Sequence, residues 1–115
     1  MNHSQKTIQL GRKSGQRRAL LATMAVSLVR DEKIQTTEAK AKVLRPLVER
    51  LVTLAKKGDV STRRVLISRV GVTATKKLMS TLAKKYETRN GGYLRITKLN
   101  DRKNDGAKLA QIEFV

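Results

Sequence analysis

Residues 34–58 of the chain read IQTTEAKAKVLRPLVERLVTLAKKG, and this run contains a strand, a helix start, a long helix and a helix stop. Ile34-Gln35-Thr36 is a short strand candidate. Thr37 is a suitable N-cap, because its hydroxyl can accept a hydrogen bond from a free N–H of the first turn, and Glu38 follows it there. Gly58 is the expected C-terminal stop. The run predicts a strand that leads directly into the longest helix of the protein.

The helix predicted over residues 38–57 has one broad apolar face. Pro46, the only proline, interrupts it. Since proline has no N–H to donate to the carbonyl of residue 42, we expect it to kink the helix or to divide it there. The apolar face consists of Val43, Leu44, Leu47, Val48, Leu51, Leu54 and Ala55.

Three more helices are expected around this one. Residues 16–33 are apolar on most of their circumference, which is typical of a helix buried on most sides. Residues 61–70, capped by Ser61 or Thr62, and residues 73–86 each carry apolar side chains on one face. Beyond the turn at residues 90–92 the period changes to two. Strands are therefore predicted over residues 93–99 and 107–115, with Ala110, Ile112 and Phe114 on one face of the last strand.

The charge of the chain is its clearest functional signal. Its 115 residues include 26 Lys or Arg against 9 Asp or Glu, which gives a formal net charge of +17. Such a charge attracts nucleic acid or an anionic membrane. With no Trp and one Phe, the chain lacks the side chains of a membrane-surface helix, and three aromatics are too few for a sheet that stacks single-stranded bases. We expect a structured nucleic acid, contacted through its phosphates and its shape.

The residues available argue against catalysis. Cysteine is absent, the single histidine is His3, and the nine carboxylates are scattered along the chain. Neither a nucleophile–base set nor a paired acid and base can be assembled from them. We expect no enzymatic activity, no cofactor or metal and no small-molecule substrate. The chain also lacks a membrane-spanning run and the apolar core of a signal peptide, so cytoplasm is the expected location, with an organelle matrix less favoured.

The first thirty residues contain six Lys or Arg and no Asp or Glu. Residues 1–15 have no periodicity and little apolar surface, so we expect them to form an extended basic arm. Residues 16–115 are then a single domain.

Two patterns are open to two interpretations. Each basic pair, such as Arg17-Arg18 or Arg63-Arg64, fits a solvated helix face when it is considered alone. The total positive charge of the pairs exceeds what solubility needs, however, and fits phosphate neutralisation. The string GGYLRI at residues 91–96 fits an ordinary turn and strand. It equally fits a turn that approaches phosphate, with Tyr93 and Arg95 projecting from the same strand face toward RNA.

Several strings, taken in order, resemble one family over essentially the whole chain. They are Leu10-Gly11-Arg12, Ser27-Leu28-Val29-Arg30, Ile34-x-Thr36-Thr37-x-x-Lys40-Ala41-Lys42, Leu54-Ala55-Lys56, Arg63-Arg64, Arg89-Asn90-Gly91-Gly92-Tyr93-x-Arg95-Ile96-x-Lys98 and Ile112-Glu113. The family is the bacterial-type ribosomal protein L seventeen of the large subunit.

The resemblance implies an α+β fold in two layers, with about four helices packed on a small mixed three-stranded sheet. The strand near Ile34 and the C-terminal hairpin would form that sheet. The family also implies a basic N-terminal arm that penetrates rRNA and a position on the large subunit near the polypeptide exit region.

The resulting hypothesis is a structural protein of the large ribosomal subunit that binds and stabilises folded large-subunit rRNA. Its partners would be that rRNA and neighbouring large-subunit proteins, without membrane contact or homo-oligomerisation. The alternatives are a basic architectural DNA-binding protein and an adaptor for an acidic protein. The candidate RNA-binding residues are His3, Lys6, Arg12, Lys13, Arg17, Arg18, Lys40, Lys42, Arg63, Arg64, Arg89, Tyr93, Arg95 and Lys98.

Overall fold

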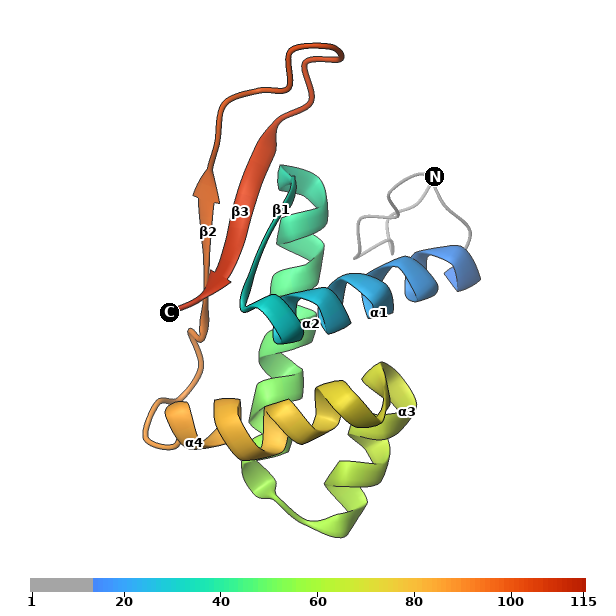
Figure 1. The fold of residues 1–115 in the computed structure, drawn as a ribbon, viewed down its shortest axis with the longest axis vertical. Coiled ribbons are helices and arrows are strands. Elements are labelled where there is room, and N and C mark those ends of the chain that lie inside the picture. Colours follow the sequence, from blue (N-terminus) through green and yellow to red (C-terminus); the bar gives the residue numbers. More distant parts are fainter. Residues whose placement is uncertain (1–13) are drawn as a thin grey trace, which may run out of the picture.

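A computed structural model describes residues 14–115 and places a three-stranded sheet beside a group of helices (Figure 1). An α+β fold is therefore confirmed. The elements, in chain order, are α1 (Ser14–Asp31), β1 (Lys33–Thr37), α2 (Glu38–Lys57), α3 (Val60–Lys77), the π-helical turn η1 (Leu78–Leu82), α4 (Ala83–Lys85), β2 (Leu94–Lys98) and β3 (Leu109–Phe114).

Helix α2 lies at the centre, where it packs against the sheet and against the other helices. Its ends are those expected: the Thr37 hydroxyl accepts a hydrogen bond from the Lys40 amide at 3.4 Å, and Gly58 closes the helix in the left-handed conformation with φ +71°. Pro46 lies inside the helix on an exposed position and does not divide it. The buried positions on both sides of Pro46, including Leu44 and Val48, hold the helix continuous against its neighbours.

The sheet has the strand order β1-β3-β2, and both pairings are antiparallel. The expected mixed sheet is therefore wrong. Strands β1 and β2 do run in the same direction, because the helices between them return the chain to the start of the sheet. However, β3 inserts between them and pairs antiparallel with each, so no two neighbouring strands are parallel.

One face of the sheet packs on the helices and the other is open. Ala110, Ile112 and Phe114 of β3 are buried, as the alternation predicted. On the opposite face, Lys33 and Arg95 are exposed. The molecule therefore has the two layers expected, with a polar outer sheet surface.

Helix α3 contains the boundary predicted between residues 70 and 73. Gly71 has φ +85° and ψ 174°, so two helical segments meet at a kink there. The Thr75 hydroxyl donates to the Gly71 carbonyl at 2.7 Å across the break. The two expected helices are thus the segments before and after Gly71, and the second continues through η1 and α4.

Helix α1 is fully buried along one face, through Leu21, Ala25, Leu28 and Val29, and half-buried beside that face, where Met24 and Val26 pack against the core. Between residues 20 and 29 only Thr23 is exposed, so α3, α2 and β1 cover the helix on most sides, as expected. The helix begins at Ser14, two residues before its predicted start. Most of the predicted arm, residues 1–13, lies outside the described residues.

Candidate nucleic-acid interface

Lysines gather at the N-terminal end of α2. Glu38 occupies the first position of the helix, and its carboxylate lies 3.0 Å from the Lys42 ammonium and 3.9 Å from that of Lys98 on β2. A hydrogen bond from Lys42, aided by the charges of Lys98 and Lys108, holds the pKa of Glu38 below its usual value. One carboxylate is thus surrounded by three lysines, and this end of the molecule retains a net positive charge.

Lys42 and Lys98 were both candidate residues, and the structure brings them together around one carboxylate. Their ammonium groups remain largely accessible, since the side chains are 60% and 79% exposed. Lys40, another candidate, is half-buried in the first turn of the same helix. We name Lys42, Lys98 and Lys108 the α2 lysine cluster.

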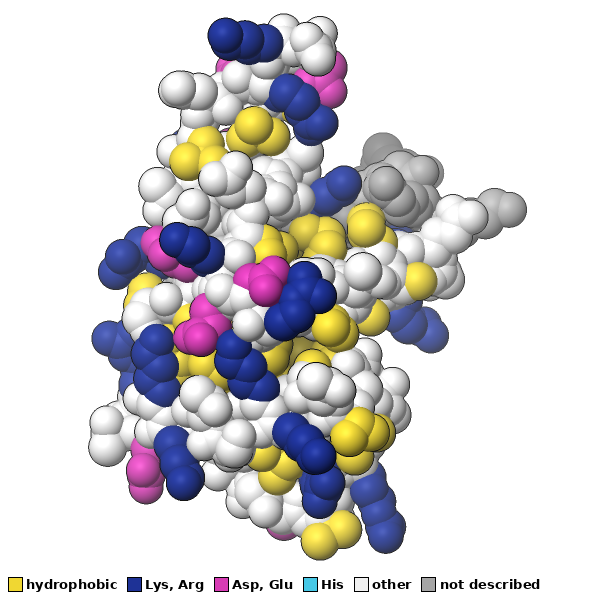
Figure 2. Space-filling model, viewed as in Figure 1, with side chains coloured by type: hydrophobic (Ala, Val, Ile, Leu, Met, Phe, Trp, Pro, Cys, Tyr) yellow, Lys and Arg dark blue, Asp and Glu magenta, His cyan; other side chains and the backbone are white. Residues whose placement is uncertain are grey.

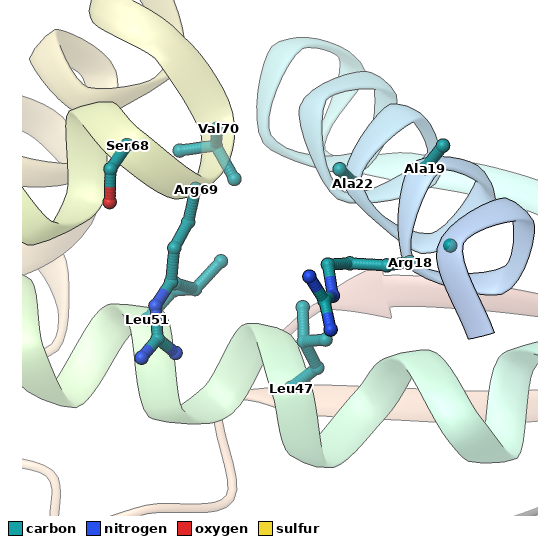
Figure 3. A pocket seen from close by; sticks show the side chains of 9 residues that line it. Arg18, Ala19, Ala22, Leu47, Leu51, Ser68, Arg69 and Val70 are labelled. Carbon is teal, nitrogen blue, oxygen red and sulfur yellow. The ribbon is translucent and has the colours of Figure 1, made fainter.

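Arginines line a groove where α1, α2 and α3 meet (Figure 3). Arg18 enters it from α1 and Arg69 from α3, above Leu47 and Leu51 of α2. Arg17 contributes to a smaller hollow next to it, which shares Arg18 and Leu47. The volume of the main groove is about 610 Å³. We name it the arginine groove; its lining residues are Gly15, Arg18, Ala19, Ala22, Leu47, Leu51, Ser68, Arg69 and Val70.

The open face of the sheet carries a row of charges across all three strands. The register sets Glu113 of β3 between Lys33 of β1 and Arg95 of β2. Two cations therefore flank one carboxylate, as at the N-terminus of α2. Arg95 is exposed on this face. Lys98, three residues further along β2, belongs to the other side of the sheet.

The remaining candidates on the domain lie near the opposite end of α2. Arg63 and Arg64 are exposed in the first turn of α3, which Asp59 caps by accepting a hydrogen bond from the Thr62 amide at 2.7 Å. Arg89 is exposed in the loop after α4, and its carbonyl accepts from the Lys56 ammonium at 2.6 Å. These residues and Lys98 are separated by the length of α2, about 30 Å for 20 residues. They therefore lie at opposite ends of the domain.

Tyr93 does not project to solvent beside Arg95, as one of the two interpretations of the GGYLRI string expected. Its side chain is 1% exposed, with its ring 5.1 Å from that of Tyr86. Hydrogen bonding with Thr53, the Gly91 backbone and Lys56 holds the pKa of Tyr93 below its ordinary value against the opposing effect of burial. Since β2 begins at Leu94, Tyr93 precedes the strand and need not share the face of Arg95.

The other candidates, His3, Lys6, Arg12 and Lys13, lie outside the described residues. The structure also places Lys33, Arg69 and Lys108 in these charged regions, although they were not among the candidates. Strand register and helix packing bring them there. No pattern in the sequence set these three residues apart, and Lys33 was predicted to end the helix over residues 16–33 instead of beginning the strand.

Cationic side chains cover many elements of the surface and are not gathered into one patch. Figure 2 shows Lys and Arg side chains from the hairpin end of the molecule to the helices at the opposite end, with few Asp or Glu between them. Within residues 14–115, no group of His, Cys, Asp or Glu is arranged to hold a metal ion. None of the helices described there is long and apolar enough to cross a bilayer.

The fold and its surface define a class: a small α+β domain whose many exposed cations suit a polyanionic partner. Comparison with known proteins then gives the family. The family model described as "Ribosomal protein L17" matches residues 20–115. The chain belongs to this family. It is a ribosomal protein, so the prediction of a non-enzymatic protein is confirmed.

The curated relatives agree with the family match. The chain is 49% identical over 116 residues to the "Large ribosomal subunit protein bL17" of Agrobacterium fabrum, of Allorhizobium ampelinum and of Brucella ovis. Each alignment covers 100% of this chain and 82% of the relative.

Proposed function

We propose that this chain is a structural constituent of the large ribosomal subunit that binds folded large-subunit rRNA in the cytoplasm. Family membership supports the ribosomal role. The net charge of +17 supports binding through phosphates, because each contact of a Lys or Arg with phosphate releases condensed counterions.

The distribution of exposed cations carries the proposal. The α2 lysine cluster lies at one end of α2, Arg63 and Arg64 lie near the other, and Arg95 is on the open sheet face. A straight duplex presents its phosphates to one side of a small protein. Folded RNA can surround the domain, so cations on several faces can each meet a phosphate group.

Residues 1–15 are proposed to extend this interface. They contain Lys6, Arg12 and Lys13 and no acid, and they precede Arg17 and Arg18 in sequence. We assign them the role of a basic arm inserted between closely packed rRNA helices, where phosphate repulsion is greatest. Neighbouring large-subunit proteins would be further partners, with no membrane contact and no homo-oligomer.

The salt dependence of rRNA binding tests the mechanism. The full-length protein should bind a large-subunit rRNA transcript with an affinity that falls by about 0.7–0.9 log units per log unit of salt for each phosphate neutralised. A weak or absent dependence on salt would contradict phosphate neutralisation. A matched DNA duplex distinguishes the architectural DNA-binding alternative, which predicts equal or tighter binding to the duplex.

Proteolysis tests the arm separately. Cleavage within residues 1–15 should slow strongly when the protein is bound to rRNA, while the unbound protein is cut rapidly. Equal cleavage rates in the two states would contradict the arm's role without affecting that of the folded domain.

A further inference from the structure

We propose that the arginine groove receives one unstacked nucleotide of the bound RNA, with the base against α2 and the phosphate beside the arginines. This inference rests on the proposed function, since it names the part of the RNA that one site on the domain takes. It goes beyond phosphate neutralisation, because it assigns a pocket to a base.

The charges at the groove favour an anionic occupant. Arg18 and Arg69 approach it from two different helices, as Figure 3 shows, and the residues that line it include no Asp or Glu. Within residues 14–115 the ion pairs involve other cations, so neither arginine is neutralised by a carboxylate there. Two guanidinium groups that flank one hollow can hold a phosphate, and their planes can also stack on a base.

The floor and walls of the groove favour a flat apolar occupant. Leu47 and Leu51 form the floor, and the wall from α1 is made of Ala19, Ala22 and the backbone of Gly15. A Cβ atom built on Gly15 would meet no atom within 4 Å, so the groove is open beside it. Its volume of about 610 Å³ is within the range of small-molecule sites. A solvated phosphate chain alone would not need this apolar floor, whereas an unstacked base does.

The position of the groove connects it to the rest of the interface. Gly15 and Arg18 lie in the first turns of α1, immediately after the basic residues 1–13 in sequence. The groove therefore adjoins the point where those residues join the domain. The same charges disfavour residues 1–13 themselves as the occupant, because Lys6, Arg12 and Lys13 would be placed against Arg18 and Arg69.

Filling the groove without altering its charge tests the proposal. Ala19→Leu adds bulk from the α1 wall and Ser68→Leu adds it from the α3 wall; both positions are exposed, so the domain should remain folded. Thr23→Leu is the matched control, since Thr23 is exposed on α1 and does not line the groove. Circular dichroism and thermal unfolding check that all three variants fold.

Binding of the full-length variants to a large-subunit rRNA transcript is the first measurement. Ala19→Leu and Ser68→Leu should each weaken binding by about tenfold, the usual effect of losing one buried base. The slope of log affinity against log salt should not change in these variants, because no cation is lost. Thr23→Leu should bind within about twofold of the wild type.

Crosslinking is the second measurement. A transcript containing 4-thiouridine should crosslink to peptides that line the groove in the wild type and in Thr23→Leu, and much less in Ala19→Leu.

Affinities and crosslinks unaffected by Ala19→Leu and Ser68→Leu would overturn the proposal while leaving rRNA binding intact. The proposal would also be overturned if Ala19→Leu and Ser68→Leu bound rRNA normally but were poorly incorporated into large subunits. The groove would then hold a segment of a neighbouring protein instead of a nucleotide. A wild type that does not bind the transcript would instead reject the proposed function.

Discussion

The ammonium nitrogen of Lys56 lies 3.2 Å from the hydroxyl oxygen of Tyr93 and 2.6 Å from the carbonyl oxygen of Arg89. One side chain from the last turn of α2 therefore holds both ends of the loop that leads into β2. The Lys56 ammonium also lies 5.3 Å from the centre of the Tyr93 ring. Tyr93 connects the loop to the core by this contact and by its burial.

The first prediction concerns Tyr93 and Arg95, which lie in the same sequence string but have different roles. Tyr93→Phe should lower the free energy of unfolding by about 0.5–1.5 kcal/mol through the lost hydrogen bonds, and Tyr93→Ala by about 3–5 kcal/mol through the cavity. Arg95→Ala should change it by less than about 0.5 kcal/mol, because the side chain is exposed on the open sheet face. Urea unfolding measures all three.

The effects of Tyr93→Phe and Arg95→Ala on rRNA affinity should have the reverse order of their effects on stability. Arg95→Ala should weaken binding, whereas Tyr93→Phe should leave the affinity of the folded protein unchanged. Loss of affinity in folded Tyr93→Phe would contradict the structural role assigned to the tyrosine.

The second prediction concerns the break in α3. Gly71→Ala should destabilise the protein by about 1–3 kcal/mol, because φ +85° with ψ 174° is a conformation that only glycine adopts without strain. The control is Gly15→Ala in α1, where the new methyl group also meets open space. That variant should be neutral, or more stable by up to about 1 kcal/mol, since alanine favours helix. Equal thermal midpoints for the two variants would show that backbone strain at Gly71 is unimportant.

The third prediction is a pH dependence at the start of α3. Hydrogen bonds from Thr62 lower the pKa of Asp59 in the folded protein. A carboxyl group with a depressed folded-state pKa contributes stability above its unfolded pKa, about 3.9, and loses it as the pH falls through the folded value. Asp59→Asn keeps a capping oxygen but cannot titrate. The wild type should therefore lose stability relative to Asp59→Asn as the pH is lowered from 5 to about 2; parallel curves of unfolding midpoint against pH would exclude this.

The fourth prediction tests the α2 lysine cluster with changes of opposite sign. Lys42→Gln combined with Lys98→Gln should weaken rRNA binding and reduce the salt slope by about 1.4–1.8, if each lysine meets one phosphate. Glu38→Gln should strengthen binding, because it removes the carboxylate that partly neutralises both lysines. Filter binding over a range of salt concentrations measures both effects. A Glu38→Gln variant with weaker binding would indicate that the carboxylate orders the lysines for RNA instead of competing with it.

Local signals in the sequence were enough to predict most of the elements. The two ends of α2 were predicted from Thr37, Gly58 and the apolar spacing between them. The alternation in β3 identified its buried face. The break at Gly71 fell between two predicted helices because glycine has little preference for helix. These features depend on neighbours within about four residues, which a single sequence displays directly.

Features that depend on distant residues were predicted poorly. Pro46 was expected to kink or divide α2, yet burial of Leu44, Val48 and Leu51 keeps the helix whole. A strand pattern at residues 93–99 gave Tyr93 and Arg95 a common face, whereas the tyrosine turned into the core before the strand began.

The sequence by itself determined that this protein is basic, α+β and lacking in catalytic groups, because composition and short-range periodicity carry that information. The tertiary structure alone decided that β3 lies between β1 and β2, that Lys42, Lys98 and Lys108 surround Glu38, and that Arg18 and Arg69 share an apolar groove. Each of these relationships joins residues far apart in the chain. Their proximity results from packing around α2, and no local pattern encodes it.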